Sequence, residues 1–497
     1  MEQKAERLFV FTIIFTFLIK TFLSITIPLT GDEAYFVLWG RHLDYGYYDH
    51  TPMIGWLMHL MLSAGNSQFL VRLPAIISSI LVGTGIYFIV KPFDKTKACL
   101  LATLFLVSPI NVLNVLISTD TPLLLFSFVS AGFLFYALKQ KNYLHYCLSG
   151  GFLGLAFLSK YFAVLLGLSY LIYFIMAKKS KDRYIGFLIL FLSVIPFAAV
   201  NLYWNYTHSW ANIMFNLFNR AGNEHLSALK FLLFVLILLY FFTPPVLYYL
   251  FIKRKEIFLK LKTGEFAFFS AVFAVPLLIL CILSFKKAVG VHWVLSFYPF
   301  LYIVLFLFLR ELEIIKSIKF MVFFTLAHLV IAATVLSLPP KYFKNTKMYY
   351  EIILGEKPQA VLYNLKQYEK DFILMTPSYT DSAILSYYSG MYFPVFDAGS
   401  HHGRQDDFIT NFKNFDEKDI LVLKEHLPDK EKYGKYFKHY EVKQFEIDGA
   451  VFYTVLGYGF NFSNYRDIAL KKIKEKYYPL PKYLPVKSDY FEEKYFQ

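Results

Sequence analysis

The stretch LFVFTIIFTFLIKTFLSITIPL, residues 8–29, decides the class of this protein. It is about 20 apolar residues long, and a helix of that length crosses the hydrocarbon core of a bilayer. A cleaved signal peptide would have a shorter apolar region followed by a small-x-small site. We therefore expect residues 8–29 to form an uncleaved first transmembrane helix.

Composition extends this conclusion to the whole chain of 497 residues. Hydrophobic residues make up 57% and charged residues 17% of the chain, whereas a soluble domain carries about 25% charged residues. The net charge of +14 would suggest nucleic acid in a soluble protein, but here most Lys and Arg residues of the apolar part lie in short loops between apolar blocks. Membrane topology explains this charge, so we expect no nucleic-acid partner. The cysteines Cys99, Cys147 and Cys281 lie inside apolar blocks and predict no disulfide framework.

Eleven apolar blocks predict eleven membrane-spanning helices. Their approximate ranges are 8–29, 70–90, 98–117, 121–138, 143–158, 161–177, 184–203, 228–251, 266–284, 292–309 and 319–338. The connecting segments alternate between the two sides, and one alternate set holds 18 Lys and Arg residues against 5 in the other. The positive-inside rule places the richer set, which includes residues 1–7, in the cytoplasm. We therefore expect a cytoplasmic N-terminus and an outward position for the loop 30–69 and for everything after Leu338.

The chain changes character after Leu338. Segment 339–497 is polar and rich in Lys and Tyr. Its strand-like runs are Phe372–Thr376, Ile420–Lys424, Tyr440–Ile447 and Val451–Leu456, and helical patterns occur near Lys357–Lys370 and Gln405–Phe415. The predicted fold is a polytopic α-helical membrane domain, residues 1–338, followed by a small outer α/β domain, residues 339–497.

Two carboxylates, Asp32 and Glu33, come directly after the first span. Thr30-x-x-Glu33 is a capping box, and acidic residues suit a helix N-terminus for structural reasons alone. Capping explains Glu33 better than Asp32. The functional alternative is acid–base chemistry at the membrane surface, for which Asp32 and Glu33 are the candidate catalytic residues.

Tyr47, Tyr48, Asp49 and His50 follow in the same loop, before an apolar segment at 52–64 that is too short to span a membrane. This segment predicts a helix lying in the membrane interface. The tyrosines could form an ordinary aromatic belt, but a belt does not explain the carboxylate–His pair beside them. An acidic loop next to a lipid-facing helix suits an enzyme that acts on a lipid head group.

The stretch GDEAYFVLWGRHLDYGYYDHTPMIGW, residues 31–56, resembles the first outer loop of membrane glycosyltransferases of the C fold. The resemblance is greatest to bacterial members of the dolichyl-phosphate-mannose protein mannosyltransferase family and to lipid A aminoarabinose transferases. Further matches follow in order through the membrane part, at VRLP (71–74), TDTP (119–122), LSKY (158–161), WNYTHSW (204–210), HW (292–293) and YP (298–299). The tail matches only loosely, through SYY (386–388) and GRQ (403–405).

This resemblance implies the C-type fold and transfer of one sugar from a polyprenyl-phosphate donor to an acceptor at the periplasmic face of a bacterial inner membrane. It assigns the family's catalytic aspartate to Asp32. The aminoarabinose transferases place an acidic residue and a lysine before two prolines, where this chain has Asp49, His50, Thr51 and Pro52. The missing lysine and proline place this sequence nearer the broader bacterial branch.

Several charged residues near span ends are further candidates for substrate binding. Their structural explanation is that they reach the membrane surface by snorkelling. Their functional explanation is that they bind the carrier phosphate or another anionic ligand. The candidates are Arg72, Asp120 and Lys160, the outward cluster Lys286, Lys287 and His292, and Arg404 in the tail.

No metal-binding motif such as HExxH or CxxC occurs in the sequence. We expect no required cofactor, because a monophosphate carrier needs a divalent cation less than a diphosphate does. A divalent metal held by Asp49, His50, His225 or His292 remains an alternative.

The acceptor stays open among lipid A or another glycolipid, a surface polysaccharide and an exported protein. The outward cations favour lipid A, modified with an aminosugar. A single displacement would invert the sugar. The rival interpretation is a transporter or flippase for a lipid-linked sugar, which explains the spans but not the acidic outer loop.

Overall fold

The structure is a computed structural model that describes residues 1–177, 180–219, 225–255, 266–399, 402–481, 483–487 and 489–497. It divides the chain into two compact units. The first, here called the membrane unit, comprises Met1–Thr26, Ser67–Val200 and Asn223–Val335. The second, here called the sheet unit, comprises Ile27–Asn66, Asn201–Gly222 and Leu336–Gln497. The sheet unit thus groups the first predicted outer loop with the tail, although the two are far apart in sequence.

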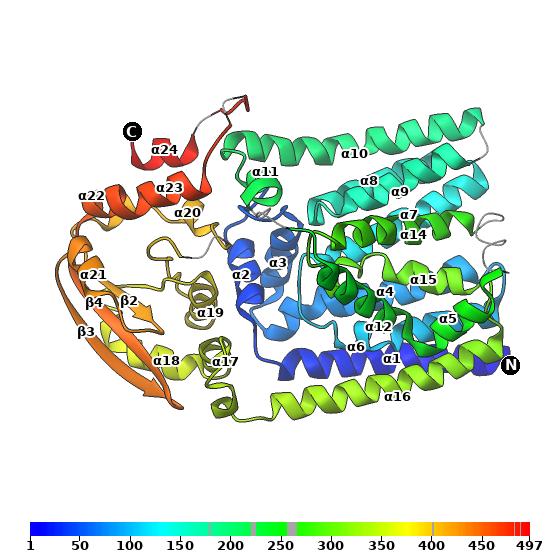
Figure 1. Cartoon of the computed structure of the whole chain (residues 1–497), viewed down its shortest axis with the longest axis horizontal. Coiled ribbons are helices and arrows are strands. Elements are labelled where there is room, and N and C mark those ends of the chain that lie inside the picture. The colour runs from blue at the N-terminus through cyan, green and yellow to red at the C-terminus, as the bar shows by residue number, and fades with distance from the viewer. Residues whose placement is uncertain (178–179, 220–224, 256–265, 400–401, 482, 488) are drawn as a thin grey trace. The chain divides into compact units, whose positions relative to one another are not determined.

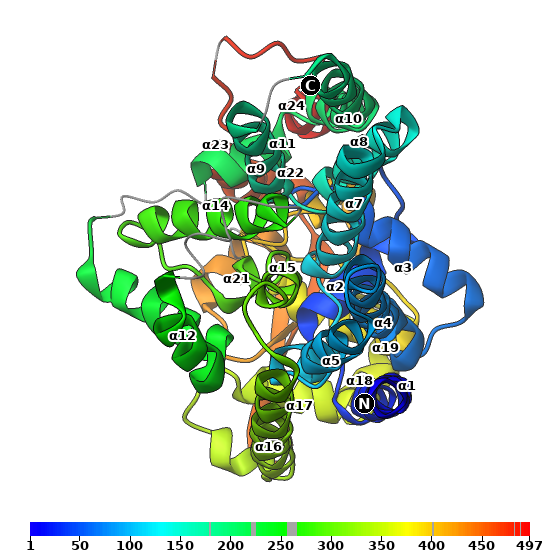
Figure 2. The ribbon, with the colours of Figure 1, turned by 90° about the vertical axis from the view of Figure 1, so that its right-hand side faces the viewer.

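Several long helices of the membrane unit run parallel to one another (Figure 1), and Figure 2 shows them nearly end-on. Its helices are α1 (Glu2–Thr26), α4 (Gln68–Val90), α5 (Lys95–Leu106), α6 (Pro109–Leu113), α7 (Asp120–Gln140), α8 (Tyr143–Ser159), α9 (Ala163–Met176), α10 (Lys181–Thr207), α12 (Ala228–Ile252), α14 (Ala267–Ser284), α15 (Tyr298–Leu305) and α16 (Glu311–Leu336), with a 3-10 turn at Val291–Trp293. Residues 201–207 of α10 and Leu336 of α16 are counted with the sheet unit.

Each predicted span overlaps a helix of the structure. Among the described residues, seven helices are long and apolar enough to cross a bilayer: α1, α4, α7, α10, α12, α14 and α16. The remaining four predicted spans contain the shorter helices α5 with α6, α8, α9 and α15. The difference arises partly at prolines and caps, because Ser108 and Pro109 end one helix and begin another inside a single apolar block.

Buried hydroxyl groups join neighbouring helices of the bundle. Ser130 on α7 bonds to Tyr170 on α9 at 2.9 Å and donates to the backbone oxygen of Ser149 on α8 at 2.8 Å. Hydrocarbon offers no competing partner for such groups, so these bonds fix helix positions. Lys20 on α1 is also buried and donates to the backbone oxygens of Asn111 and Asn114, both at 2.9 Å, which satisfies the end of α6.

The sheet unit contains a four-stranded sheet in the order β1-β2-β4-β3, drawn in yellow to orange in Figure 1. Strands β1 (Ile373–Met375) and β2 (Ile420–Lys424) are parallel, whereas β4 (Ala450–Phe460) is antiparallel to both β2 and β3 (Phe437–Ile447). Asp448 and Gly449 form the tight β3–β4 turn with positive φ angles of 51° and 87°. All four predicted strands are therefore confirmed.

The sheet unit also contains helices. They are α2 (Gly31–Arg41), α3 (Met53–Ala64), α11 (Ala211–Met214), α17 (Tyr349–Glu356), α18 (Pro358–Leu365), α19 (Tyr379–Ser389), α20 (Asp406–Ile409), α21 (Lys430–Tyr436), α22 (Phe462–Tyr465), α23 (Lys471–Tyr477) and α24 (Tyr490–Tyr495), with π turns at Phe215–Asn219 and Arg466–Leu470 and 3-10 turns at Pro340–Phe343, Lys366–Tyr368 and Phe412–Phe415. Helix α3 confirms the short apolar helix predicted at 52–64. Helix α19, which the sequence did not predict, packs directly on α2.

Candidate active site

Asp32 lies in the first turn of α2, and its side chain is exposed. The hydroxyl of Tyr379, the first residue of α19, donates to Oδ1 of Asp32 across 3.0 Å. The N-terminus of a helix carries partial positive charge, which favours a carboxylate at this position. The sheet unit thus presents an oriented and accessible carboxylate.

Glu33 has a different environment from its neighbour. Its side chain is buried, and Oε2 accepts hydrogen bonds from the backbone N–H and the hydroxyl of Thr30, both at 3.1 Å. The hydroxyl of Thr30 in turn accepts the N–H of Glu33, which completes the capping box. The structural explanation therefore accounts for Glu33, and Asp32 remains as the candidate catalytic carboxylate.

Two glycines allow α2, α19 and the 403–405 segment to meet at Asp32. A Cβ atom at Gly31 would lie 2.6 Å from Cβ of Thr380, so only glycine permits this approach of α2 to α19. Gly403 has a φ of +66°, and a Cβ there would lie 2.2 Å from Cγ of Tyr379. The ring of Tyr379 also packs on Tyr35 with centroids 4.9 Å apart. These close contacts hold the Tyr379 hydroxyl against Asp32.

Further carboxylates extend from Asp32 through the sheet unit. Glu351 on α17 accepts a hydrogen bond from the backbone of Gly31, and burial followed by the charge of Asp32 raises the pKa of Glu351. Burial chiefly raises the pKa of Asp381 to about 7 and that of Glu425 to about 8, and the charge of Glu351 adds to both shifts. We call Asp32, Glu351, Asp381 and Glu425 the acidic cluster. Asp381 and Glu425 therefore hold protons near neutral pH, and the negative charge near Asp32 comes from Asp32 and Glu351.

Tyr379 itself remains a hydrogen-bond donor across the physiological pH range. Burial raises its pKa well above the usual value, and the charge of Asp32 adds to the shift. A neutral phenol beside a carboxylate donates its proton in a hydrogen bond without transferring it. The pair therefore orients Asp32 rather than neutralising it.

Tyr47 and Tyr48 are both fully buried, and their role in binding substrate stays a prediction. The ring of Tyr47 stacks on Trp39 at 4.4 Å, and its hydroxyl donates to the backbone oxygen of Trp39 at 3.0 Å. The backbone N–H of Tyr48 donates to Oε1 of Gln405 at 2.9 Å, and its ring lies in the core of the sheet unit. Both tyrosines hold the first loop together.

Asp49 and His50 are neighbours in space as well as in sequence. Oδ2 of Asp49 lies 3.9 Å from Nε2 of His50, and the His50 ring lies 5.8 Å from the ring of Trp39. No group of three or more His, Cys, Asp or Glu side chains suited to a metal ion occurs among the described residues. Whether Asp49 and His50 contact substrate stays a prediction.

Arg404 is buried and hydrogen-bonded within the sheet unit, and its role in binding a substrate anion stays a prediction. Its guanidinium makes two hydrogen bonds to the carboxylate of Asp407, at 2.8 and 2.5 Å, and a third to the backbone oxygen of Ala398. Its planar group also lies 5.1 Å from the ring centre of Tyr477. This bidentate ion pair is a structural element of the sheet unit.

Two other candidates, Asp120 and Lys160, form an ion pair in the membrane unit. Nζ of Lys160 lies 2.8 and 2.7 Å from the two carboxylate oxygens of Asp120, and both side chains are largely buried. Asp120 begins α7, and Lys160 follows the last residue of α8. An ammonium carries three N–H donors, of which Asp120 takes two. The two charges thus compensate each other at the ends of their helices.

The remaining candidates of the membrane unit differ in their burial and contacts. Arg72 on α4 is completely buried and donates to the backbone oxygen of Ser24 on α1 at 2.9 Å, so it anchors two helices. Lys286 and His292 are exposed, and Lys287 is half-buried. The backbone oxygen of Lys286 accepts a hydrogen bond from Nζ of Lys230 at 2.7 Å. His225 is exposed. Their roles in substrate or metal binding stay predictions.

Sequence reasoning missed Tyr379, Glu351 and Lys20. Tyr379 and Glu351 belong to the tail, where neither spacing nor composition distinguishes them from other Tyr and Glu residues. Lys20 gave a clearer signal, because a lysine inside an apolar span of about 20 residues is costly unless its donors are satisfied.

Comparison with known proteins agrees with this architecture. Residues 49–204 match the dolichyl-phosphate-mannose-protein mannosyltransferase family. The lipid A galacturonosyltransferase RgtD of Rhizobium johnstonii is 29% identical over 219 residues, which are 40% of this chain and 45% of that protein. The match therefore spans less than half the length of this relative.

Two solved structures share the fold. ArnT from Cupriavidus metallidurans in the apo state superposes with a TM-score of 0.62 at 11% identity, covering 90% of this chain and 97% of that one. The same protein bound to undecaprenyl phosphate gives a TM-score of 0.60 at 12% identity, with the same coverage. The predicted fold class and the predicted resemblance to C-fold membrane glycosyltransferases are confirmed.

Proposed function

We propose that this chain, a multi-pass membrane protein with the C-type glycosyltransferase fold, transfers one sugar from a polyprenyl-phosphate donor to an acceptor, foremost lipid A. The reaction would occur at the periplasmic face of a bacterial inner membrane, with the N-terminus in the cytoplasm. The observation that carries the proposal is the exposed Asp32 carboxylate, oriented by Tyr379 at the N-terminus of α2.

The names of similar proteins support this proposal. One relative is named for galacturonosyl transfer to lipid A, and one structure of similar fold contains undecaprenyl phosphate. These parallels support a polyprenyl-phosphate donor and a lipid A acceptor for this chain. An exported protein or a surface polysaccharide remains the alternative acceptor within the same fold.

The proposed chemistry is one displacement at the anomeric carbon. The acceptor oxygen forms a bond to that carbon while the bond to the carrier phosphate oxygen breaks, which inverts the sugar. Asp32 takes the proton of an acceptor hydroxyl, a role worth about 10²–10⁴-fold. If the acceptor is already an anionic phosphate, Asp32 instead stabilises positive charge that develops on the sugar ring.

The departing phosphate requires positive charge, and Lys160 is the proposed source. Asp120 takes two of its N–H groups, so the third can donate to a phosphate oxygen. Stabilising the charge of the leaving group is the largest expected contribution to catalysis. The exposed Lys286 is a second candidate, whereas the buried Arg72 is better explained as a helix anchor. We propose no required metal.

The acidic cluster bears on the nature of the sugar. A uronic acid would bring a second negative charge close to Asp32 and Glu351, whereas an aminosugar would bring a compensating positive charge. We therefore propose an aminosugar donor, in contrast to the sugar in the name of the galacturonosyltransferase relative. Competition between matched aminosugar and uronic acid donors tests this choice, and preference for the uronic acid would contradict it.

A purified-protein assay tests the function itself. Transfer from a synthetic polyprenyl-phosphate sugar to lipid A in detergent needs no membrane barrier, whereas transport by a flippase does. Asp32→Asn should reduce kcat by about 10²–10⁴-fold. Mass spectrometry of lipid A from cells with and without the gene identifies the sugar and the acceptor together. A wild-type protein that transfers nothing to any of the three acceptor classes would refute the proposal.

A further inference from the structure

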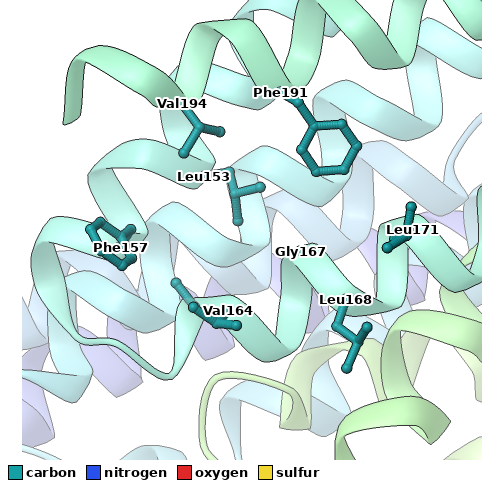
Figure 3. A pocket seen from close by; sticks show the side chains of 9 residues that line it. Leu153, Phe157, Val164, Gly167, Leu168, Leu171, Phe191 and Val194 are labelled. Carbon is teal, nitrogen blue, oxygen red and sulfur yellow. The ribbon is translucent and has the colours of Figure 1, made fainter. Parts of the chain in front are cut away.

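An apolar groove lies between α8, α9 and α10 of the membrane unit (Figure 3). Its volume is about 350 Å³. The side chains that define it include Leu153 and Phe157 of α8, Val164, Leu168 and Leu171 of α9, and Phe191 of α10. All of its lining side chains are hydrocarbon, so a ligand in the groove must itself lack polar atoms there.

The glycines around the groove differ in how closely their neighbours approach. Gly150 and Gly154 bring α8 against α10, because a Cβ at these positions would lie 2.1 Å from the backbone oxygen of Leu190 and 2.2 Å from Cδ2 of Phe197. Gly167 on α9 is not packed in this way. A Cβ there would meet only Cδ2 of Leu153, at an ordinary 3.8 Å. The groove therefore remains open beside Gly167, where a side chain would otherwise project.

One end of the groove lies at the turn that contains Lys160. Phe157 and Val164, which line the groove, flank this turn three and four residues from Lys160. From Val164, the groove follows α9 to Leu171, which is about 10 Å along the helix axis at 1.5 Å per residue. Val164, Leu168, Leu171 and Phe191 are partly exposed on the bundle surface, so the groove opens toward the bilayer.

We propose that this groove binds the first part of the polyprenyl chain of the donor, with the carrier phosphate at Lys160. The inference rests on the proposed function and adds the place where the lipid tail lies. A ligand with one anionic head and a long, nonpolar and flexible tail matches the arrangement of one ammonium followed by a hydrocarbon channel. Packing contacts with Phe157 and Phe191 provide the selectivity, because the surrounding lipid is itself apolar.

The test fills the groove without disturbing the charge pair. Gly167→Leu adds a side chain into the open space beside Leu153. Gly151→Leu is the matched control, because Gly151 lies on α8 outside the groove lining and its Cβ would meet nothing within 4 Å. Each variant is assayed with a long-chain polyprenyl-phosphate sugar and with the same donor shortened to a few prenyl units.

We expect Gly167→Leu to raise KM for the long donor about tenfold, while KM for the short donor and both KM values of Gly151→Leu stay at the wild-type level. An unchanged KM for the long donor, or an equal rise for both donors, would overturn the inference. Native mass spectrometry provides a second readout that needs no turnover. Wild type and Gly151→Leu should retain added polyprenyl phosphate, and Gly167→Leu should lose it.

The two proposals fail in different ways. A wild-type protein that retains polyprenyl phosphate but transfers no sugar would refute the proposed function and leave the groove assignment intact. Equal retention by wild type and Gly167→Leu, or retention of bilayer phospholipid in place of polyprenyl phosphate, would refute the groove assignment alone.

Discussion

The hydroxyl of Tyr379 lies 3.0 Å from Oδ1 of Asp32, although the two residues are 347 positions apart in the chain. Both belong to the sheet unit, so the contact is made inside one compact body. Asp32 comes from the first predicted outer loop and Tyr379 from the tail domain. The tail is therefore part of the candidate active site and not only a cap on it.

Removal of the Tyr379 hydroxyl should slow catalysis without unfolding the protein. Tyr379→Phe keeps the ring that packs on Tyr35 but deletes the hydrogen bond to Asp32. We expect kcat to fall about 10- to 150-fold with little change in KM, because a hydrogen bond to a charged group is worth about 1.5–3 kcal/mol. Tyr350→Phe, on α17 of the same unit, is the control and should retain wild-type kcat. Equal rates in both variants would exclude an orienting role for Tyr379.

Glu33 should prove to be structural rather than catalytic. Glu33→Gln keeps an oxygen that accepts from the N–H and hydroxyl of Thr30, so we expect activity within a few-fold of wild type. Glu33→Ala loses both bonds and should destabilise α2 by about 1 kcal/mol. Activity and thermal unfolding in detergent distinguish the variants. A large loss of kcat in a stable Glu33→Gln protein would restore Glu33 as a catalytic residue.

Variants of the Asp120–Lys160 pair distinguish an effect on protein stability from an effect on donor binding. Removal of one partner leaves a buried charge uncompensated and should cost about 3–5 kcal/mol. The double variant Asp120→Asn/Lys160→Met leaves no charge and should recover much of that loss. Its KM for the donor should nevertheless stay elevated if Lys160 binds the carrier phosphate. A stable double variant with a wild-type KM would show that Lys160 does not bind the carrier phosphate.

Asp406 should make the sheet unit less stable as the pH rises. Burial raises the pKa of Asp406 to about 7 from an ordinary value of 3.8, although Tyr392 donates to its Oδ1 at 2.6 Å. Between about pH 4 and pH 7 the carboxyl keeps its proton in the folded state, whereas it has already lost it in the unfolded chain. The free energy of unfolding therefore falls as the pH rises through this window and stays low above it.

Asp406→Asn cannot ionise and should be more stable than wild type at pH 8, by about 2–4 kcal/mol, with a smaller difference at pH 5. Thermal unfolding in detergent at both pH values measures this difference. Asp371→Asn changes an exposed carboxylate and should leave the pH dependence as in wild type. The same pH dependence in wild type and Asp406→Asn would contradict the assignment.

The elements that depend on local pattern were predictable from sequence. Apolar blocks located the described helices of the bundle, and short strand-like runs located the strands Ile420–Lys424 and Val451–Leu456. The capping box at Thr30 and Glu33 was readable because its partners are three residues apart. Helix α19 was missed, since residues 379–389 carry polar and apolar side chains on all faces of a helix that the sheet unit largely buries.

The sequence alone determined that this protein is a helical membrane protein with a polar tail domain and a candidate carboxylate at position 32, because hydropathy and short-range spacing encode these features. Only the tertiary structure decided which side chains meet. The hydroxyl of Tyr379 donates to Asp32, and Lys160 pairs with Asp120. Arg404 is buried in an ion pair with Asp407, and Tyr48 lies separately in the core. These contacts, except for the short Arg404–Asp407 pair, join residues far apart in the chain. They depend on how whole elements pack, which no local pattern of residues records.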